Sequence, residues 1–250
     1  MPSSTIVVLI TGANSGVGYA ATKAIADASP NYHVIMACRN PEKGEKAMQE
    51  IKASGIEGEL SLLQLDIIDQ RSVAAATKHV QSQFGRLDVL VNNAGIGAQT
   101  GSLKDQLETT FRTNVVGPAM LTEAMEPLLL QSRKPYVLNI SSGLGSLGRA
   151  TDIEADDYHF PYTPYRASKA ALNMITVEAW KKLGKQGVKV FAVSPGFVRS
   201  NLRGTTEEQI SGGGFAGPAE VSGQTILSIV EGKRDADNGR FVHKDGLYPW

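Results

Sequence analysis

The sequence predicts an α/β fold, in which a doubly wound parallel sheet carries helices on both faces. Two features of the 250 residues lead to this expectation. Short, β-branched apolar runs alternate with stretches whose apolar residues recur at helical spacing, which is typical of repeated βαβ units. The apolar runs are also nearly continuous, as expected for strands that are buried on both faces of a parallel sheet.

The elements can be assigned in chain order. Strands are expected at Ile6–Ile10, His33–Ala37, Leu60–Leu65, Val89–Val91, Tyr136–Ile140 and Val188–Val193. Helices are expected at Gly16–Ala28, Pro41–Ser54, Gln70–Phe84, Leu107–Gln131, Pro164–Leu183 and Pro218–Val230. Arg240–Val242 is a candidate for one further strand, at the sheet edge. No linker, repeat or low-complexity tract interrupts the series, so residues 1–250 are expected to form a single domain.

Composition narrows the class of function. The 25 basic residues balance the 25 acidic ones, which argues against a nucleic-acid partner and against a polybasic membrane attachment. The apolar run near the N-terminus is too short to span a membrane. Cys38 is the sole cysteine, so no intrachain disulfide can form, and a cytoplasmic location is expected. The four histidines form no cluster with metal-ligand spacing, and no metal is expected.

A glycine-rich segment follows the first strand and precedes the first helix. Residues 11–18 read TGANSGVG, a G-x-x-x-G-x-G pattern. Such glycines permit a tight turn and the close approach of a pyrophosphate, while the helix N-terminus offers free N–H groups. The absence of Gly-Lys-Ser/Thr argues against a P-loop. The sequence therefore predicts a dinucleotide-binding Rossmann domain whose cofactor-binding residues include Gly12, Asn14, Ser15, Gly16, Val17 and Gly18.

Arg39 follows the second strand and bears on the choice of cofactor. An acidic residue near this position binds the ribose 2′-hydroxyl of NAD, whereas an arginine accommodates the 2′-phosphate of NADP. Here Cys38 stands where the acid is expected, and Arg39 comes next. This favours NADP(H), although a surface arginine that pairs with Glu42 is the alternative.

Further polar and glycine residues follow the other strands in a fixed order. They are Asp66-Ile67, Asn93-Ala94-Gly95, Asn114, Ser141-Ser142, Tyr165 with Lys169, and Pro195-Gly196. Together with the glycine-rich segment, this set resembles the short-chain dehydrogenase/reductase family in its single-domain form. The resemblance runs from about Ile6 to Ser200. It depends on the ordered combination, because tyrosine and lysine at this spacing occur in many helices by chance.

Tyr165, Lys169 and Ser142 make chemical sense as a set. Tyr165 and Lys169 lie four residues apart and share one face of a helix. A free tyrosine has a pKa of about 10, which a nearby ammonium group is expected to lower. The hydroxyl can then exchange a proton with a carbonyl oxygen. Ser142 follows a central strand, at the sheet edge where ligands bind, and its hydroxyl can hold the substrate oxygen.

The resemblance implies further roles. Lys169 would also bind the nicotinamide ribose, and Asn114 would hold a water in a proton relay. Asp66 and Ile67 would contact the adenine. The remaining cofactor contacts would come from Asn93, Ala94, Gly95, Pro195, Gly196, Val198 and Ser200.

Two long segments interrupt the βα rhythm, and both follow strand ends at one predicted edge. Residues 148–163 form an acidic and aromatic insertion, so that Ser142 and Tyr165 lie 23 positions apart. It resembles insertions of carbonyl-reductase-like members that cover a helix face used elsewhere for oligomerisation. A homodimer, a homotetramer and a monomer therefore all stay open. Residues 199–217 are expected to form a substrate-binding lid, and a mostly apolar pocket is expected with walls from Leu144, Phe160, Phe197, Leu202 and Phe215.

These expectations combine into one hypothesis of function. The chain is expected to be an NADPH-dependent reductase that transfers a hydride to a ketone or aldehyde, reversibly, with a small-molecule carbonyl or alcohol as its partner. The catalytic residues are expected to be Asn114, Ser142, Tyr165 and Lys169. An NAD-linked alcohol dehydrogenase and a non-catalytic NADP(H)-binding regulatory protein are the alternatives. The substrate itself is not specified by any of these motifs.

Overall fold

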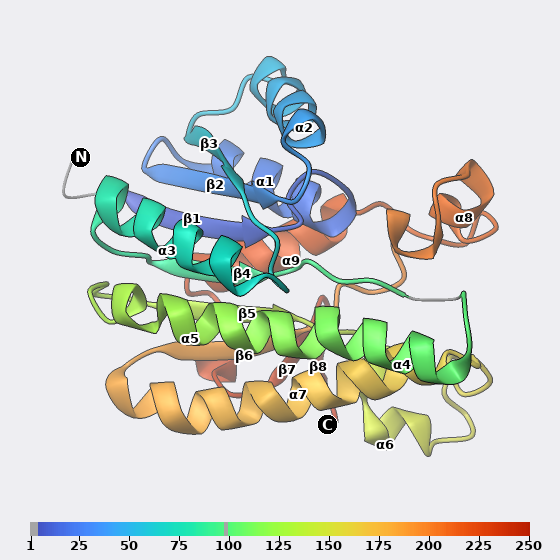
Figure 1. The fold of residues 1–250 in the computed structure, drawn as a ribbon. Helices are drawn as coiled ribbons and strands as arrows, with labels where there is room; N and C mark the ends of the chain where they lie inside the picture. The colour runs from blue at the N-terminus through green and yellow to red at the C-terminus, as the bar shows by residue number, and fades with distance from the viewer. Residues whose placement is uncertain (1–4, 98–99) are drawn as a thin grey trace.

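The computed structural model describes residues 5–97 and 100–250, and it is built on one eight-stranded sheet (Figure 1). The strands lie side by side in the order β3-β2-β1-β4-β5-β6-β7-β8. All neighbours pair in parallel except β7 and β8, which pair antiparallel. The bounds are β1 Ile6–Thr11, β2 Tyr32–Cys38, β3 Glu59–Gln64, β4 Val89–Asn92, β5 Tyr136–Ile140, β6 Lys189–Val193, β7 Phe241–His243 and β8 Gly246–Tyr248.

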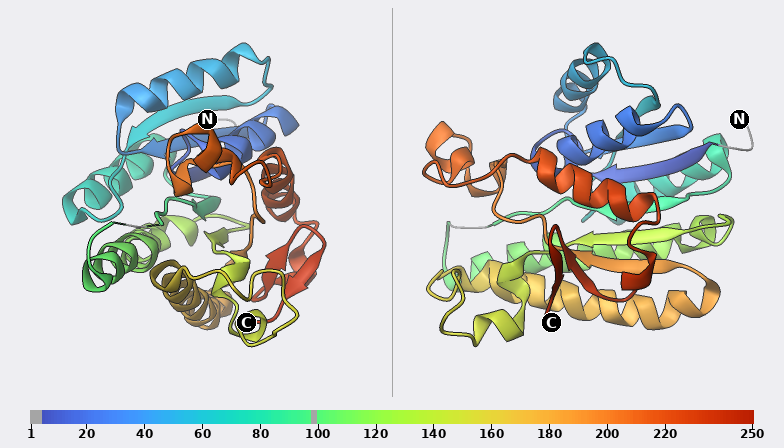
Figure 2. Two further views of the ribbon diagram at one scale, coloured as in Figure 1. Left: turned by 90° about the vertical axis from the view of Figure 1, so that its right-hand side faces the viewer. Right: turned by 180° about the vertical axis from the view of Figure 1, so that it is seen from behind.

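Helices cover both faces of the sheet, which confirms the predicted doubly wound α/β architecture. Their bounds are α1 Gly16–Ala28, α2 Pro41–Ala53, α3 Gln70–Phe84, α4 Leu103–Phe111, α5 Gly117–Leu129, α6 Leu147–Ala150, α7 Thr163–Leu183, α8 Glu207–Ser211 and α9 Glu220–Val230. The helices α3, α5 and α7 lie on one face (Figure 1), and α1 and α9 lie on the other, seen from behind in Figure 2. Each face has its own buried cluster, with Ile25 of α1 and Ile226 of α9 in one and Val73 of α3 and Leu121 of α5 in the other.

Local signals explain where several helices begin and end. The Asn40 side chain accepts from the backbone N–H of Lys43 at 2.9 Å and caps α2. Asp69 caps α3 in the same way, through the N–H of Arg71 at 2.8 Å. Gly85 ends α3 with a φ of 71°, a left-handed conformation that glycine adopts without strain. These polar caps satisfy N–H groups that a helix start otherwise leaves unpaired.

The helix predicted at Leu107–Gln131 is longer and irregular. Its first part is α4, which begins at Leu103 behind a capping box of Ser102 and Asp105. The middle is a π-helical turn at Arg112–Val116, and α5 follows. Single π-turns of this kind are often associated with functional sites. This one carries Asn114.

The C-terminal part of the sheet also goes beyond the prediction. A strand forms close to the expected Arg240–Val242, but it is not the edge of the sheet, because β8 pairs with it on the outer side. The short helix α6 lies at the start of segment 148–163, and the short helix α8 lies inside segment 199–217. Within residues 5–97 and 100–250, no helix combines the length and the apolar character that crossing a membrane requires.

Candidate active site

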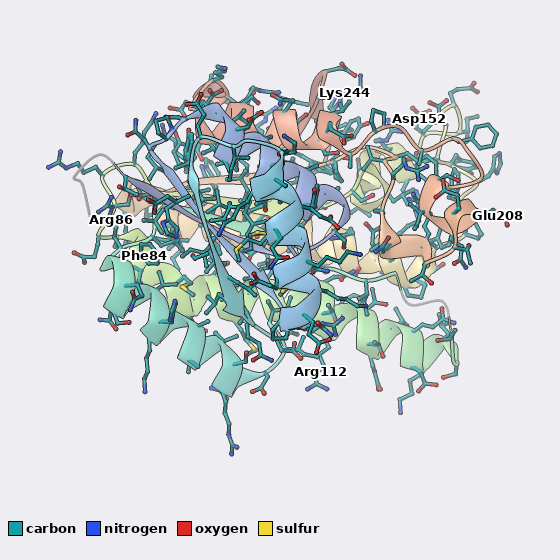
Figure 3. All side chains as sticks on the ribbon, turned by 90° about the horizontal axis from the view of Figure 1, so that it is seen from above. Phe84, Arg86, Arg112, Asp152, Glu208 and Lys244 are labelled. Carbon is teal, nitrogen blue, oxygen red and sulfur yellow. The ribbon has the colours of Figure 1, made fainter. Side chains whose placement is uncertain are left out.

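The parallel strands end at one edge of the sheet, and the segments predicted to carry function meet there. In Figure 1, α8 lies beyond this edge, and α6 lies near the amino-terminal end of α7. Seen from above in Figure 3, Glu208 of α8 and Asp152 of the insertion lie at the same end of the molecule, far from Phe84 and Arg86. Loops at the carboxyl ends of parallel strands are the usual place for a ligand in an open α/β sheet.

The glycine-rich loop is held against the segment after β4. The Thr11 hydroxyl accepts from the backbone N–H groups of Asn93 and Ala94, each at 2.9 Å. The Asn93 side-chain amide donates to the Thr11 carbonyl at 2.7 Å. Gly18 has no space for a side chain, since a Cβ there would lie 2.4 Å from the Gly12 oxygen. These contacts explain why an Asn-Asn-Ala-Gly segment accompanies this loop.

The amino end of α1 has the features of an anion site. Ser15 is its N-cap residue, yet it makes no side-chain cap bond, and the first turn contains no acidic residue. Gly12 and Gly16 have φ values of 65° and 53°, so the turn that leads into the helix depends on glycine. N–H groups of this helix start are therefore left for a ligand. With Asn14 and Val17 in the same turn, the loop fits the pyrophosphate of a dinucleotide.

The other candidate cofactor-binding residues lie in the segments after β3 and β6, at the same edge of the sheet. Asp66 and Ile67 follow β3, and the Asp66 carboxylate accepts from the backbone N–H of Ile68 at 3.2 Å. The Pro195 carbonyl accepts from the Ser222 hydroxyl of α9 at 2.8 Å, which fixes the segment after β6. Gly196 follows with a φ of 81°.

Val198 and Ser200 connect the lid segment to the rest of the site. Val198 forms a parallel bridge with Gly217, which closes the base of segment 199–217. The Ser200 Cβ lies next to Gly16, where an added Cβ would be 3.1 Å away. The structure thus brings the start of this segment against the glycine-rich loop.

Arg39 is exposed at the end of β2. Among the residues the structure describes, no carboxylate forms an ion pair with it, Glu42 included. The Cys38 thiol beside it is buried and donates to the Asn40 carbonyl at 3.2 Å. The sequence alternative of an Arg39–Glu42 pair is therefore not formed, and the guanidinium is available to a ligand.

Tyr165, Lys169 and Ser142 come together where β5 ends and α7 begins. Tyr165 and Lys169 lie one turn apart on α7, with the Lys169 ammonium 5.6 Å from the centre of the tyrosine ring. Lys169 is buried and donates to the Ile140 carbonyl, the last residue of β5, at 2.7 Å. The Ser142 hydroxyl accepts from the backbone N–H of Leu144 at 3.3 Å and lies close enough to Tyr165 to affect its titration.

The pKa values correct one expectation. Burial raises the pKa of Tyr165 to about 12, although the Ser142 hydroxyl and the Arg203 guanidinium act in the opposite direction. Burial also lowers the pKa of Lys169 to about 8. The prediction that the pKa of Tyr165 falls beside Lys169 is thus wrong, because desolvation of the phenolate outweighs the effect of its neighbours.

The two adjacent serines after β5 have different environments. The Ser141 hydroxyl is buried and donates to the Asn173 side chain of α7 at 2.6 Å. Asn173 in turn donates to the Gly145 carbonyl at 3.1 Å. Ser141 therefore joins β5 to α7, while Ser142 is the serine that faces Tyr165.

Asn114 is fully buried and bonded on every side of its amide. Its oxygen accepts from the Ile96 N–H at 2.8 Å, and its nitrogen donates to the Ile96 carbonyl at 2.9 Å. The same nitrogen donates to the Ser168 hydroxyl of α7 at 3.0 Å. Its side chain thus connects the segment after β4 to the helix that carries Tyr165.

Segment 199–217, the predicted lid, folds compactly around α8. Its glycines at 212, 213 and 214 have φ values of 57°, 68° and 91°. A cavity of about 400 Å³, open to solvent, lies between this lid and the start of α7, and its lining is polar. The lining residues are Tyr162, Arg203, Glu208, Gln209, Gly212 and Gly213.

The residues expected as apolar walls lie outside this polar cavity. Leu144 lines a second cavity, of about 270 Å³, between α6 and α7. Phe160, Phe197, Leu202 and Phe215 line neither of these two cavities, and Phe215 is 86% exposed. Burial of a side chain in the lid depends on contacts between distant parts of the lid, which the local sequence does not specify.

The insertion is attached to the C-terminal strand. Arg149 forms an ion pair with Asp157 at 3.2 Å and stacks 4.7 Å over the Tyr248 ring of β8. The Gly148 N–H donates to the Trp250 carbonyl at 2.8 Å. These contacts thus join residues 248–250 to the insertion beside the amino-terminal half of α7.

Sequence reasoning missed one charged residue of this region. Arg203 acts on Tyr165 electrostatically. Nothing in the sequence around Arg203 indicates this role, because the position of Arg203 depends on how the lid folds. Elsewhere in the described ranges, histidine, cysteine and carboxylate side chains form no group that could bind a metal ion.

Comparison with known proteins agrees with this architecture. The family model described as short chain dehydrogenase matches residues 6–211. Short-chain dehydrogenase/reductase tropE of Talaromyces stipitatus is 36% identical, over 96% of this chain and 95% of its own length. The NADPH-bound carbonyl reductase from chicken fatty liver superposes with a TM-score of 0.82 at 27% identity, over 98% of this chain and 99% of that one. Carbonyl reductase Sniffer of D. melanogaster superposes with a TM-score of 0.80 at 26% identity, over 98% of this chain and 100% of that one. This chain therefore belongs to the short-chain dehydrogenase/reductase family of nicotinamide-dependent oxidoreductases, in its single-domain, carbonyl-reductase-like form.

Proposed function

We propose that this protein is an NADPH-dependent reductase that transfers a hydride to the carbonyl carbon of a ketone or aldehyde, and that it also catalyses the reverse oxidation. The observation that carries the proposal is the placement of Tyr165, Ser142 and Lys169 together at the carboxyl edge of the sheet, on the side where the glycine-rich loop opens. The solved carbonyl reductases support the same direction of reaction.

The chain's own groups supply the proton and hold the substrate. Bound NADPH supplies the hydride. The Tyr165 hydroxyl is protonated at neutral pH, since even the ordinary tyrosine pKa of about 10 lies well above that pH, and it donates its proton to the carbonyl oxygen. Ser142 holds the same oxygen by a hydrogen bond. The Lys169 ammonium, 5.6 Å from the ring centre, stabilises the phenolate that forms until solvent returns a proton.

The cofactor lies, in this proposal, along the carboxyl edge of the sheet. The loop of Gly12, Asn14, Ser15, Gly16, Val17 and Gly18 binds the pyrophosphate, and Arg39 binds the 2′-phosphate. Asp66 and Ile67 contact the adenine. The nicotinamide half lies against Asn93, Ala94, Gly95, Pro195, Gly196, Val198 and Ser200, with Lys169 on its ribose.

Asn114 keeps, in this proposal, the catalytic role of holding a water in a proton relay, and its side chain also has a positioning role. Its side-chain donors are used by Ile96 and Ser168, so its amide holds the segment after β4 against α7. Segment 199–217 acts as the lid, and its three consecutive glycines with positive φ give it the freedom to move over a substrate.

The experiment is to measure oxidation of NADPH and of NADH by the purified protein against aromatic, aliphatic and cyclic ketones and aldehydes. We expect turnover with NADPH. Faster turnover with NADH, above all in the direction of alcohol oxidation, would instead indicate an NAD-linked alcohol dehydrogenase. Tight NADPH binding without any turnover across the panel would favour the regulatory alternative.

A further inference from the structure

Arg203, in the 3₁₀ turn Asn201–Arg203 of the lid, has a side chain that is fixed in place. Its Nε donates to the Gln209 carbonyl at 3.0 Å. Its Nη2 donates to the carbonyls of Val198 and Ile210, at 2.9 and 2.8 Å. Its guanidinium also stacks 4.5 Å over the Phe197 ring. A guanidinium held by this many contacts is oriented before any ligand arrives.

The charge of Arg203 is not neutralised by these contacts. All three acceptors are neutral carbonyl groups, and among the described residues no carboxylate forms an ion pair with it. Glu207 of the same lid is paired with Arg199 at 2.8 Å. The two N–H groups of Nη1 have no hydrogen-bond partner within the described part of the chain. These free donors and the positive charge make the Arg203 guanidinium a site where an anion binds more favourably than a neutral group.

The residues around Arg203 indicate which kind of molecule would carry the anionic group. Arg203 lines the cavity of about 400 Å³ together with Tyr162, which is three residues before Tyr165. The rings of Tyr162 and Phe160 are stacked 6.2 Å apart, and both are partly exposed, at 37% and 46%. A flat aromatic molecule can lie against the Tyr162 ring, which lines the cavity, while it reaches toward Tyr165.

We propose that Arg203 is a substrate-recognition residue, which binds an anionic oxygen (a carboxylate or a phenolate) carried by an aromatic carbonyl substrate. This inference rests on the proposed function, since it assigns the substrate class of the same site. Arginine binds such oxygens with strong, charge-assisted hydrogen bonds. Glu208 lines the same cavity, and its negative charge disfavours a ligand with a second negative charge there.

The kinetic test compares 4-carboxybenzaldehyde with its methyl ester, which differ in charge but share the aromatic aldehyde. We expect kcat/KM for the carboxylate to exceed that for the ester about tenfold or more in the unmodified protein. In Arg203→Gln this ratio should fall to about one, and Arg203→Lys should retain part of it. A hydroxybenzaldehyde and its methyl ether, assayed above the pKa of the phenol, decide whether a phenolate is also accepted.

Arg199→Gln is the matched control, because it removes a lid arginine that is already paired with Glu207. The ratio should not change in this variant. If Arg203 only kept the lid folded, Arg203→Gln would lower kcat/KM for the carboxylate and for the ester by the same factor. The ratio of the two kcat/KM values would then stay unchanged, so this ratio separates recognition from structure. An unmodified protein without preference, or an equal change in Arg199→Gln, would overturn the proposal.

A binding arm needs no turnover and so separates this inference from the proposed reductase activity. Terephthalate, an aromatic dicarboxylate without a reducible carbonyl, and its monomethyl ester are titrated calorimetrically into the NADPH-loaded protein. We expect binding of the monomethyl ester to weaken about tenfold in Arg203→Gln and not in Arg199→Gln, and the dianion to bind more weakly than the monoester because of Glu208. Equal affinities in all three proteins would refute anion recognition by Arg203, whatever the kinetic assay shows.

Discussion

The Lys169 ammonium donates a 2.7 Å hydrogen bond to the Ile140 carbonyl, the last residue of β5. The lysine is only 4% exposed, and this bond fixes its nitrogen between the sheet edge and the Tyr165 ring. A single neutral acceptor does not compensate for the loss of water around the charge, so burial lowers the pKa of Lys169 to about 8.

This lowered pKa predicts a pH dependence of stability in the cofactor-free protein. Between pH of about 8 and the ordinary lysine value near 10.5, the unfolded chain holds a proton that the native chain has released. Stability therefore rises with pH through this window, and below it the native state carries the full cost of the buried charge. The free energy of unfolding, measured by urea denaturation, should rise relative to that of Lys169→Met by up to about 3 kcal/mol between pH 8 and 10.5. A difference that stays constant over this range would show that Lys169 is not destabilised by burial.

The two serines after β5 should separate stability from catalysis. Ser141→Ala leaves the Asn173 oxygen without its 2.6 Å donor and should cost about 1–3 kcal/mol of stability. Its kcat should change little, because Ser141 does not face Tyr165. Ser142→Ala should lose only about 1 kcal/mol of stability, from its 3.3 Å bond to the Leu144 N–H, but at least about a hundredfold in kcat. Thermal denaturation and steady-state kinetics on both variants check this, and the reverse pattern would mean that the serine assignment is wrong.

The glycine-rich loop makes a steric prediction. In Gly18→Ala, the new Cβ would meet the Gly12 oxygen at 2.4 Å and the Asn93 amide at 2.5 Å, so the loop must shift. We expect a loss of about 2 kcal/mol or more in stability and a large loss of NADPH affinity. Gly184→Ala is the matched control, because its φ is −60° and its nearest neighbour lies at 3.6 Å. Fluorescence titration with NADPH should find affinity unchanged in the control; retained affinity in Gly18→Ala would exclude a tight loop.

Arg39 should determine cofactor preference. Arg39→Asp places a carboxylate where the 2′-phosphate is proposed to lie, so NADPH binding should weaken at least about tenfold more than NADH binding. Since no carboxylate pairs with Arg39 in the described structure, stability should change by less than about 0.5 kcal/mol. Dissociation constants for both cofactors check the prediction. An equal loss for both would assign Arg39 a structural role.

The sequence was sufficient for the fold and for the residues that lie on regular elements. Alternation of strands and helices is a local pattern, so β1 to β6 and the helices around them were predicted with small errors at their ends. Tyr165 and Lys169 could be placed on one face for the same reason, since helical spacing determines it. Ser142 was assigned through the family resemblance, and the buried bond of Ser141 to Asn173 now gives a physical reason for the choice.

The features of the site that the sequence does not predict depend on contacts between residues that are distant in sequence. The charge of Arg203 reaches Tyr165 only because the fold of the lid brings Arg203 near the start of α7, and the pKa of Tyr165 depends on how much of the site is desolvated. The π-turn around Asn114 forms within an apolar helix pattern that gives no sign of it. The polar cavity beside Tyr162 likewise comes from two segments that are about 40 residues apart.

The most direct test of the central claim is the NADPH-dependent reduction of an aromatic aldehyde by Tyr165→Phe. This change removes the proton donor and keeps the ring that packs near Lys169. We predict that turnover falls by at least about a thousandfold, while NADPH affinity and thermal stability stay close to those of the unmodified protein. Turnover retained within tenfold of that protein would contradict the assignment of Tyr165 as the proton donor.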